Sequence, residues 1–400
     1  MTGLRRVVIV GNGIAGVTAA DTLRTVGFEG ELTIVGDERH AAYSRPALSK
    51  ALLRDAADVT SHLLPPPAHG ATELRGVSAT GLDPLARAVQ LSDGERLPYD
   101  GLVIATGCRA RRLNDRHGAQ QDDVHPDDAP HELTLRTLDD AIVLRQRITS
   151  RPSVVVIGGG PLGMEVASGA IEAGCAVTLV SQGAPLASQL GAHLSGVFVA
   201  AARAHGLQLV PTSAVGLERV GEMTRVTLAD GATRDADLVV TAVGDRANVE
   251  WLASSGLLTD GALVVDATGR VRPDIAAAGD VATIPTPHGI RRVPLWSSAI
   301  EQGRAAATAL VTGQAHTADP RPYFWTEQFG LSLKAVGHLP FTGEPSLVDG
   351  EPDTDRALWR WEGAPAEGGG AAAAVNYRIP IPRLRRLCDP TPSTPIEPSS

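Results

Sequence analysis

The stretch RVVIVGNGIAG, residues 6–16, decides the fold of this chain. Its first five residues are a short apolar run rich in β-branched side chains, which is typical of a buried parallel strand. A helical pattern then runs from about residue 14 to residue 26. A GxGxxG turn between a strand and a helix lets the backbone approach a pyrophosphate, which the free N–H groups and the dipole of the helix bind. The glycines are Gly11, Gly13 and Gly16.

The end of the next strand indicates which nucleotide this unit binds. Residues 31–35 form a second apolar run, and Asp37 and Glu38 follow it. A carboxylate at this place accepts hydrogen bonds from ribose hydroxyls, as FAD or NAD requires. The alternative is that both acids are solvated at a strand end.

The same strand–turn–helix pattern recurs later in the chain. Residues 153–157 predict a strand, GGGPLG forms the turn, residues up to about 173 are helical, and residues 176–180 predict the next strand. Two such units favour two dinucleotides, one held and one exchanged. The glycines of this second turn are Gly158, Gly160 and Gly163.

The second unit does not identify its coenzyme. Ser181 stands where the first unit has its acids, and Gln182 follows. No carboxylate repels a 2′-phosphate there and no adjacent arginine binds one, so both NADH and NADPH remain open.

Three further strand ends carry glycine turns. Asp93-Gly94 and Asp230-Gly231 are hairpin signals that precede the first two of these strands. The third, AAAGDVA, ends in a carboxylate that can meet the ribityl chain of a flavin. The turn residues are Thr106 and Gly107, then Gly244, then Gly279 and Asp280.

Composition narrows the class of protein. A chain of 400 residues with 43% hydrophobic residues predicts two or three globular domains. The net charge of −9 disfavours nucleic-acid binding, and the three separated cysteines predict neither a redox dithiol nor a zinc site. The apolar run near the N-terminus is too short for a signal peptide or a membrane span, so we expect a soluble cytoplasmic protein. Residues 109–131 favour a linker, 364–374 a Gly/Ala loop and 389–400 a disordered tail.

The motifs together resemble the FAD-dependent, NAD(P)H-oxidising ferredoxin reductases of oxygenase systems, the putidaredoxin reductase-like group. The matching stretches occur in the order of that family over about residues 4–340: GNGIAG, YSRPALSK, LVIATG, GGGPLGMEVA, GDRANVEWLASSGL, AAAGDVA, WSSAIEQG and PYFWTEQFG. The resemblance implies an α/β fold of the glutathione reductase type with two Rossmann-like domains and a smaller α+β C-terminal domain. The implied boundaries are 1–112 with 247–318 for FAD, 113–246 for NAD(P)H, 319–388 for the C-terminal domain and 389–400 for the tail.

The resemblance also implies roles for individual residues. Lys50 and Glu165 form a pair beside the flavin, Trp325 lies on the acceptor side, and Trp296 opens a helix that faces the flavin N1–C2=O edge. The remaining matches to FAD positions are Ala15, Asp37, Glu38, Arg45, Val77, Arg136 and Asp280.

The implied activity is hydride transfer from NADH or NADPH to one non-covalent FAD per chain, then single electrons to a transiently bound 2Fe-2S ferredoxin that serves a P450 or Rieske oxygenase. We expect a monomer or a homodimer, with Arg291, Arg292 and Arg304 facing an acidic ferredoxin. Two alternatives stay open: a stand-alone NAD(P)H-dependent flavin oxidoreductase acting on a small molecule or O₂, and a signalling flavoprotein of the apoptosis-inducing-factor type.

The chain departs from the family pattern in four places. Ser44 and Ala47 lie in the usual RPPLSK context, Ala247 replaces a proline, and Ser181 replaces the usual acid. Of these, Ser181 bears most directly on the coenzyme.

Overall fold

The first unit of the molecule is built on a six-stranded sheet with the order β19-β20-β7-β1-β2-β3. The computed structural model describes residues 3–54, 62–113, 132–314, 321–351, 356–363 and 369–389. Neighbouring strands of this sheet run parallel except β19 and β20. The strands are β1 (Arg6–Val10), β2 (Glu31–Gly36), β3 (Thr72–Arg75), β7 (Gly101–Ile104), β19 (Arg270–Arg272) and β20 (Ile275–Ala277).

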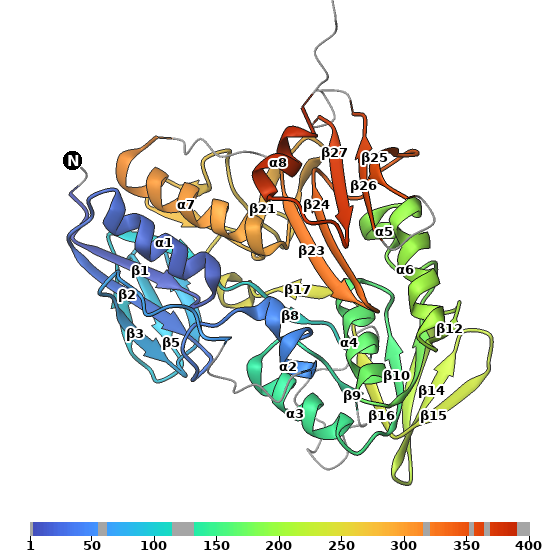
Figure 1. Cartoon of the computed structure of the whole chain (residues 1–400). Helices are drawn as coiled ribbons and strands as arrows, with labels where there is room; N and C mark the ends of the chain where they lie inside the picture. The colour runs from blue at the N-terminus through green and yellow to red at the C-terminus, as the bar shows by residue number, and fades with distance from the viewer. Residues whose placement is uncertain are drawn as a thin grey trace, which may run out of the picture.

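Two helices that are far apart in the sequence lie side by side on this sheet (Figure 1). They are α1 (Ile14–Thr25) and α7 (Trp296–Thr312). Small residues let them approach closely, since a Cβ at Gly303 would lie 2.6 Å from the carbonyl oxygen of Ala15. This contact brings the segment after residue 247 onto the N-terminal unit.

The second unit is a five-stranded parallel sheet with the order β12-β11-β10-β16-β9. The sequence prediction for β10 (Ser153–Ile157) and β11 (Ala176–Val180) is confirmed at both ends of each strand. The other elements are β9 (Glu132–Leu133), β12 (Gln208–Val210), β16 (Leu238–Thr241), α3 (Leu138–Ile148), α4 (Pro161–Glu172), α5 (Ala187–Leu190) and α6 (Ala192–Ala204).

The third unit is the antiparallel sheet β23-β24-β27-β26-β25, followed by α8 (Ile381–Arg386). In Figure 1 its strand β23 runs down toward α4. The predicted Gly/Ala loop is wrong over its last residues, because Ala371–Val375 form the buried strand β27. Cross-strand pairing with large neighbours such as Trp359 overrides the weak strand propensity of alanine. The other strands are β23 (Tyr323–Gln328), β24 (Leu331–Val336), β25 (Ser346–Gly350) and β26 (Ala357–Trp361).

Three small sheets and one strand pair complete the fold. Both predicted hairpins are confirmed, since Gly94 and Gly231 have positive φ between β5 and β6 and between β14 and β15. The pair β8–β17 carries the chain between the first two units, and the predicted domain boundaries near it stay predictions. The strands are β4 (Ala79–Asp83), β5 (Ala88–Leu91), β6 (Arg96–Pro98), β8 (Cys108–Ala110), β13 (Ala214–Val220), β14 (Met223–Leu228), β15 (Thr233–Ala236), β17 (Asp245–Ala247), β18 (Leu263–Val264), β21 (Ala282–Thr286) and β22 (Gly289–Arg292); the short helices are η1 (Arg45–Ala47), α2 (Ala51–Arg54) and η5 (Glu250–Leu252).

Several expectations concern segments at the margins of the described residues. The first two residues of the predicted linker, 109 and 110, belong to strand β8. Residues 114–131 of the linker and 390–400 of the predicted tail lie outside the described part. Asp389 is fixed by Arg321, whose guanidinium lies 2.7 Å away. Among the described residues, no helix has the length and apolar character to cross a membrane.

Candidate active site

The outer glycines of both turns are required by backbone packing. A Cβ at Gly11 would lie 2.1 Å from the carbonyl oxygen of Ala105, and one at Gly16 would lie 1.9 Å from that of Gly11. The second turn repeats this geometry at Gly158 and Gly163, with 2.2 Å and 2.0 Å to the carbonyl oxygens of Ala242 and Gly158. In both units the helix therefore begins directly against the end of the first strand.

The middle glycines meet no such obstacle. A Cβ at Gly13 would have no heavy atom within 4 Å, and the nearest atom to one at Gly160 is 4.0 Å away. Helices α1 and α4 begin there with no side-chain cap and no acid in the first turn, so their first N–H groups stay free. Open space in front of free amides is what a pyrophosphate requires, and both turns fit a dinucleotide.

The two acids after β2 have different surroundings. Glu38 accepts hydrogen bonds from the Arg45 guanidinium at 2.5 Å and from the Tyr43 hydroxyl at 2.6 Å. Burial, strengthened by the Glu38 carboxylate, raises the pKa of Tyr43 far above its ordinary value. Asp37 is exposed, and Val77 lies next to this strand end because its N–H donates to the carbonyl of Gly36. Arg45 is thus placed at the acidic end of β2, and Asp37 is left accessible to a ribose.

Asp280 is fixed at one oxygen only. Its Oδ2 accepts from the Arg136 guanidinium at 2.8 Å and lies 3.5 Å from the thiol of Cys108. Burial raises the pKa of Cys108 to about 12, so the thiol stays protonated and able to donate. The pKa of Arg136 is also raised: burial lowers it, but the nearby acidic groups, Asp280 above all, together outweigh burial. No described residue donates to Oδ1, which leaves this oxygen for a ligand hydroxyl.

The turn after β7 is held to the residue that follows β17. The Thr106 hydroxyl donates to the Asn248 carbonyl at 2.8 Å, and the Asn248 amide donates to the Thr106 carbonyl at 2.9 Å. Gly107 has φ +65° and Gly244 has φ +103°, which both favour glycine. Gly279, with φ +80°, touches α1, since a Cβ there would lie 2.9 Å from that of Ala15.

Lys50 and Glu165 form a buried ion pair between the two nucleotide-binding units. The Lys50 Nζ lies 2.9 Å from Glu165 Oε1, and the two side chains are 12% and 5% exposed. Glu165 also accepts from the Thr326 hydroxyl at 2.5 Å and from the Ser49 hydroxyl. The sequence-based pair is therefore in contact, and each of the three structural units contributes a residue to it.

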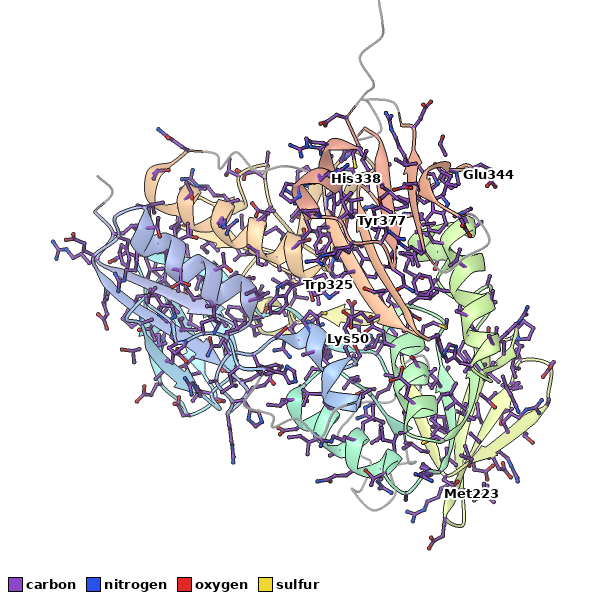
Figure 2. All side chains as sticks on the ribbon, viewed as in Figure 1. Lys50, Met223, Trp325, His338, Glu344 and Tyr377 are labelled. Carbon is purple, nitrogen blue, oxygen red and sulfur yellow. The ribbon has the colours of Figure 1, made fainter. Side chains whose placement is uncertain are left out.

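Trp325 lies beside this pair. Figure 2 shows it next to Lys50, whose Nζ lies 5.8 Å from the centre of its ring. Tyr323 stacks on the tryptophan at 5.6 Å between ring centres. Trp296 is the first residue of α7, as expected, and the adjacent Ser297 hydroxyl donates to the Tyr323 carbonyl at 2.6 Å. Strand β23 and the start of α7 are therefore joined at this site.

Ser181 lies above the second glycine turn. A Cβ at Gly159 would lie 2.4 Å from the Ser181 hydroxyl, so the side chain faces the turn. Its position agrees with a contact to the ribose of a bound coenzyme.

The sequence reasoning did not identify every polar residue of the site. Ser49, Thr326 and Asn248 all lie inside the family motifs, but no local pattern marks their hydroxyl or amide groups as partners. The expectation for Arg292 is wrong, because its guanidinium is turned inward to the Asp280 carbonyl at 2.7 Å and to Asp245. Arg304 is exposed but paired with Glu301, and the Arg291 guanidinium donates to the carbonyl of Leu339.

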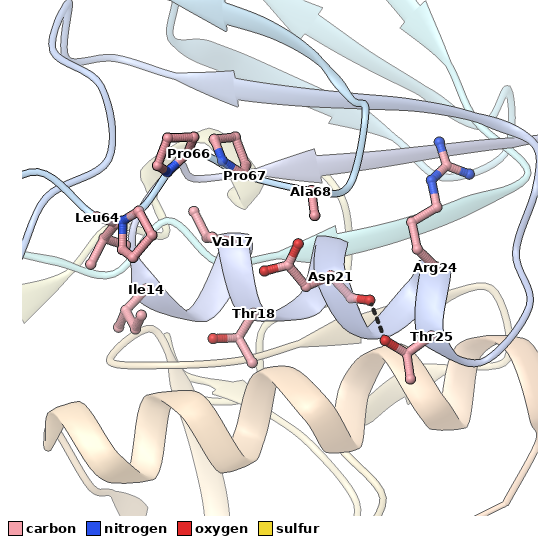
Figure 3. Close-up of a pocket in the computed structure, with 11 residues that line it drawn as sticks. Ile14, Val17, Thr18, Asp21, Arg24, Thr25, Leu64, Pro66, Pro67 and Ala68 are labelled. Carbon is pink, nitrogen blue, oxygen red and sulfur yellow. Dashed lines mark hydrogen bonds between the residues drawn. The ribbon is translucent and has the colours of Figure 1, made fainter.

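A surface cavity of about 410 Å³ lies elsewhere, between α1 and the proline-rich segment 64–68 (Figure 3). None of the predicted site residues lines it. The three cysteines, Cys108, Cys175 and Cys388, are free and buried. The described residues hold no cluster of side chains that could bind a metal ion.

Residues 5–303 match the family model described as pyridine nucleotide-disulphide oxidoreductase. The chain belongs to this family. Similar proteins include rhodocoxin reductase of Rhodococcus erythropolis, 36% identical with 87% of this chain and 81% of the relative covered. The 3-phenylpropionate/cinnamic acid dioxygenase ferredoxin–NAD(+) reductase component of Photorhabdus laumondii is 31% identical with 95% of each chain covered. The reductase in a solved covalent putidaredoxin reductase–putidaredoxin complex superposes with a TM-score of 0.82 at 30% identity, covering 96% of this chain and 92% of that chain.

Proposed function

We propose that this chain is an FAD-dependent NAD(P)H:ferredoxin reductase that supplies electrons to a P450 or Rieske oxygenase. The observation that carries the proposal is the match, along 80% or more of each chain, to rhodocoxin reductase and to the ferredoxin–NAD(+) reductase component of a dioxygenase. The site supports it, because both glycine turns leave open space for a dinucleotide and the Lys50–Glu165 pair joins the two units that carry them. The absence of a cysteine beside this pair in sequence agrees with a flavin that reacts without a dithiol.

When bound, FAD would take a hydride from NAD(P)H and release the two electrons singly. The residues of the chain hold and polarise the reactants. The free amides of α1 would hold one pyrophosphate and those of α4 the other, while Arg136 fixes Asp280, which would hold the flavin side chain. The uncapped start of α7 favours negative charge on a flavin edge placed there.

The proposal is tested with the purified protein, FAD, NADH or NADPH, and a 2Fe-2S ferredoxin. We expect a yellow protein with about one releasable FAD per chain and fast ferredoxin reduction. If the chain delivers its electrons to a ferredoxin, electron flow to O₂ alone should be much slower. A protein that stays colourless with FAD would contradict the cofactor. Equal rates with and without ferredoxin would favour the stand-alone oxidoreductase instead.

Replacing the middle glycine of the first turn by alanine should affect FAD binding, whereas replacing an outer glycine should affect stability. Gly13→Ala should fold normally but bind FAD more weakly, because its methyl group occupies the space left for the pyrophosphate. Gly16→Ala should lose stability, because its methyl group clashes with the backbone of Gly11. Flavin-release titration and urea unfolding measure the two effects. Unchanged FAD affinity in Gly13→Ala would place the pyrophosphate elsewhere.

We expect Ser181 to determine how strongly this chain discriminates between NADH and NADPH. We expect Ser181→Glu to raise the preference for NADH over NADPH by about tenfold, since a carboxylate repels the 2′-phosphate. Ser181→Ala, which adds no charge, is the matched control and should change the ratio little. The measurement is kcat/KM for both coenzymes, and an unchanged ratio in Ser181→Glu would mean that this side chain does not meet the ribose.

Lys50 should be required as a lysine. Lys50→Arg should slow flavin reduction by NAD(P)H in stopped flow while FAD stays bound, because a guanidinium is larger and prefers two-pronged partners. Glu165→Ala should do the same, since an unpaired buried charge costs about 3–5 kcal/mol. Lys334→Arg is the control: it replaces the other lysine, whose Nζ makes one long contact to the carbonyl of Ile379. A wild-type rate in Lys50→Arg would remove this role.

A further inference from the structure

Glu165 belongs to the nucleotide-binding half of the molecule, yet part of its fixation comes from the C-terminal sheet. Thr326 is fully buried in β23, and its hydroxyl donates to Glu165 Oε1 at 2.5 Å. That oxygen is the same one that pairs with Lys50 at 2.9 Å. Two donors on one carboxylate oxygen fix where the oxygen lies, and through it where the lysine ammonium lies.

The Thr326 hydroxyl also accepts a hydrogen bond. Gln328, which is 1% exposed, donates from Nε2 to Thr326 Oγ1 at 2.9 Å. Because the hydroxyl accepts from Gln328, its own proton points to Glu165. The direction of this chain of hydrogen bonds is therefore set from Gln328 to Thr326 to the carboxylate.

Strand β23 presents its two faces to the two members of the ion pair. Successive side chains of a strand point to opposite faces, so Trp325 and Thr326 diverge. Trp325 lies over Lys50 at 5.8 Å, while Thr326 reaches Glu165. The same strand thus contacts the cation through an aromatic ring and the anion through a hydroxyl.

We propose that Thr326 is a positioning residue through which the C-terminal sheet fixes the Lys50–Glu165 pair, and so couples the acceptor side at Trp325 to the coenzyme side. The inference rests on the proposed function, which defines the acceptor side and the coenzyme side. The contact itself is independent of that function, because it lies entirely within the chain.

Thr326→Val tests the proposal, since valine keeps the shape and removes the donor. We expect flavin reduction at saturating NAD(P)H to slow by about tenfold, because the Lys50–Glu165 pair loses a hydrogen bond that fixes it. FAD content should not change. Thr326→Ser restores the hydroxyl and should recover most of the rate. The matched control is Thr224→Val, which removes another fully buried hydroxyl that has no partner in the described part of the chain, and should leave the rate unchanged.

A double-mutant cycle separates positioning from general damage. If Thr326 acts through Glu165, adding Thr326→Val to Glu165→Ala, which removes the acceptor, should slow flavin reduction no further than Glu165→Ala alone. The same cycle, read as unfolding of the holoprotein in urea, should also be non-additive, and this readout does not depend on activity. Additive losses in both measurements, or a wild-type rate in Thr326→Val, would overturn the proposal.

Failure of the proposed function gives a different result. In that case the wild-type protein itself shows no NAD(P)H-dependent flavin reduction, while the unfolding cycle still reports whether Thr326 and Glu165 are coupled. A wild-type protein that reduces its flavin, with no coupling in either cycle, would leave the function intact and remove only Thr326.

Discussion

The carboxylate of Glu165 is the group on which the arrangement of this molecule depends. It is almost fully buried, and a buried charge is tolerated only where a counter-charge and hydrogen-bond donors surround it. Its donors come from two places, the segment with Ser49 and Lys50 and strand β23 with Thr326, while helix α4 carries the glutamate itself. Satisfying one carboxylate therefore requires the three structural units to meet at one point.

The meeting point joins the unit that carries the first glycine turn to the unit that carries the second. In each parallel sheet the glycine turn follows the carboxyl end of the first strand, where open α/β sheets bind their ligands. The β8–β17 pair and the contacts of Arg136 and Arg292 with Asp280 and Asp245 join the two halves. Arg292, which was expected on a docking surface, instead helps to hold these halves together.

Sequence reasoning succeeded where the signal is local. The strand–glycine–helix pattern predicted β10 and β11 to the residue, because short apolar runs and positive-φ glycines specify the backbone without reference to distant partners. The Lys50–Glu165 pair came from the resemblance, not from spacing. The poly-alanine segment was predicted as a loop and is the buried strand β27, since its place between β24 and β26 supplies the packing that alanine itself lacks.

The sequence by itself determined the two strand–glycine–helix units, and its motifs identified the family and, through it, the Lys50–Glu165 pair. Tertiary structure decided which polar groups complete the site. Ser49 is 116 residues and Thr326 161 residues away from Glu165 along the chain, so no spacing rule connects them. A serine or threonine hydroxyl in a motif is compatible with a turn, a cap or a solvent contact. Only the packing of β23 against α4 turns one of them into a donor to a buried carboxylate.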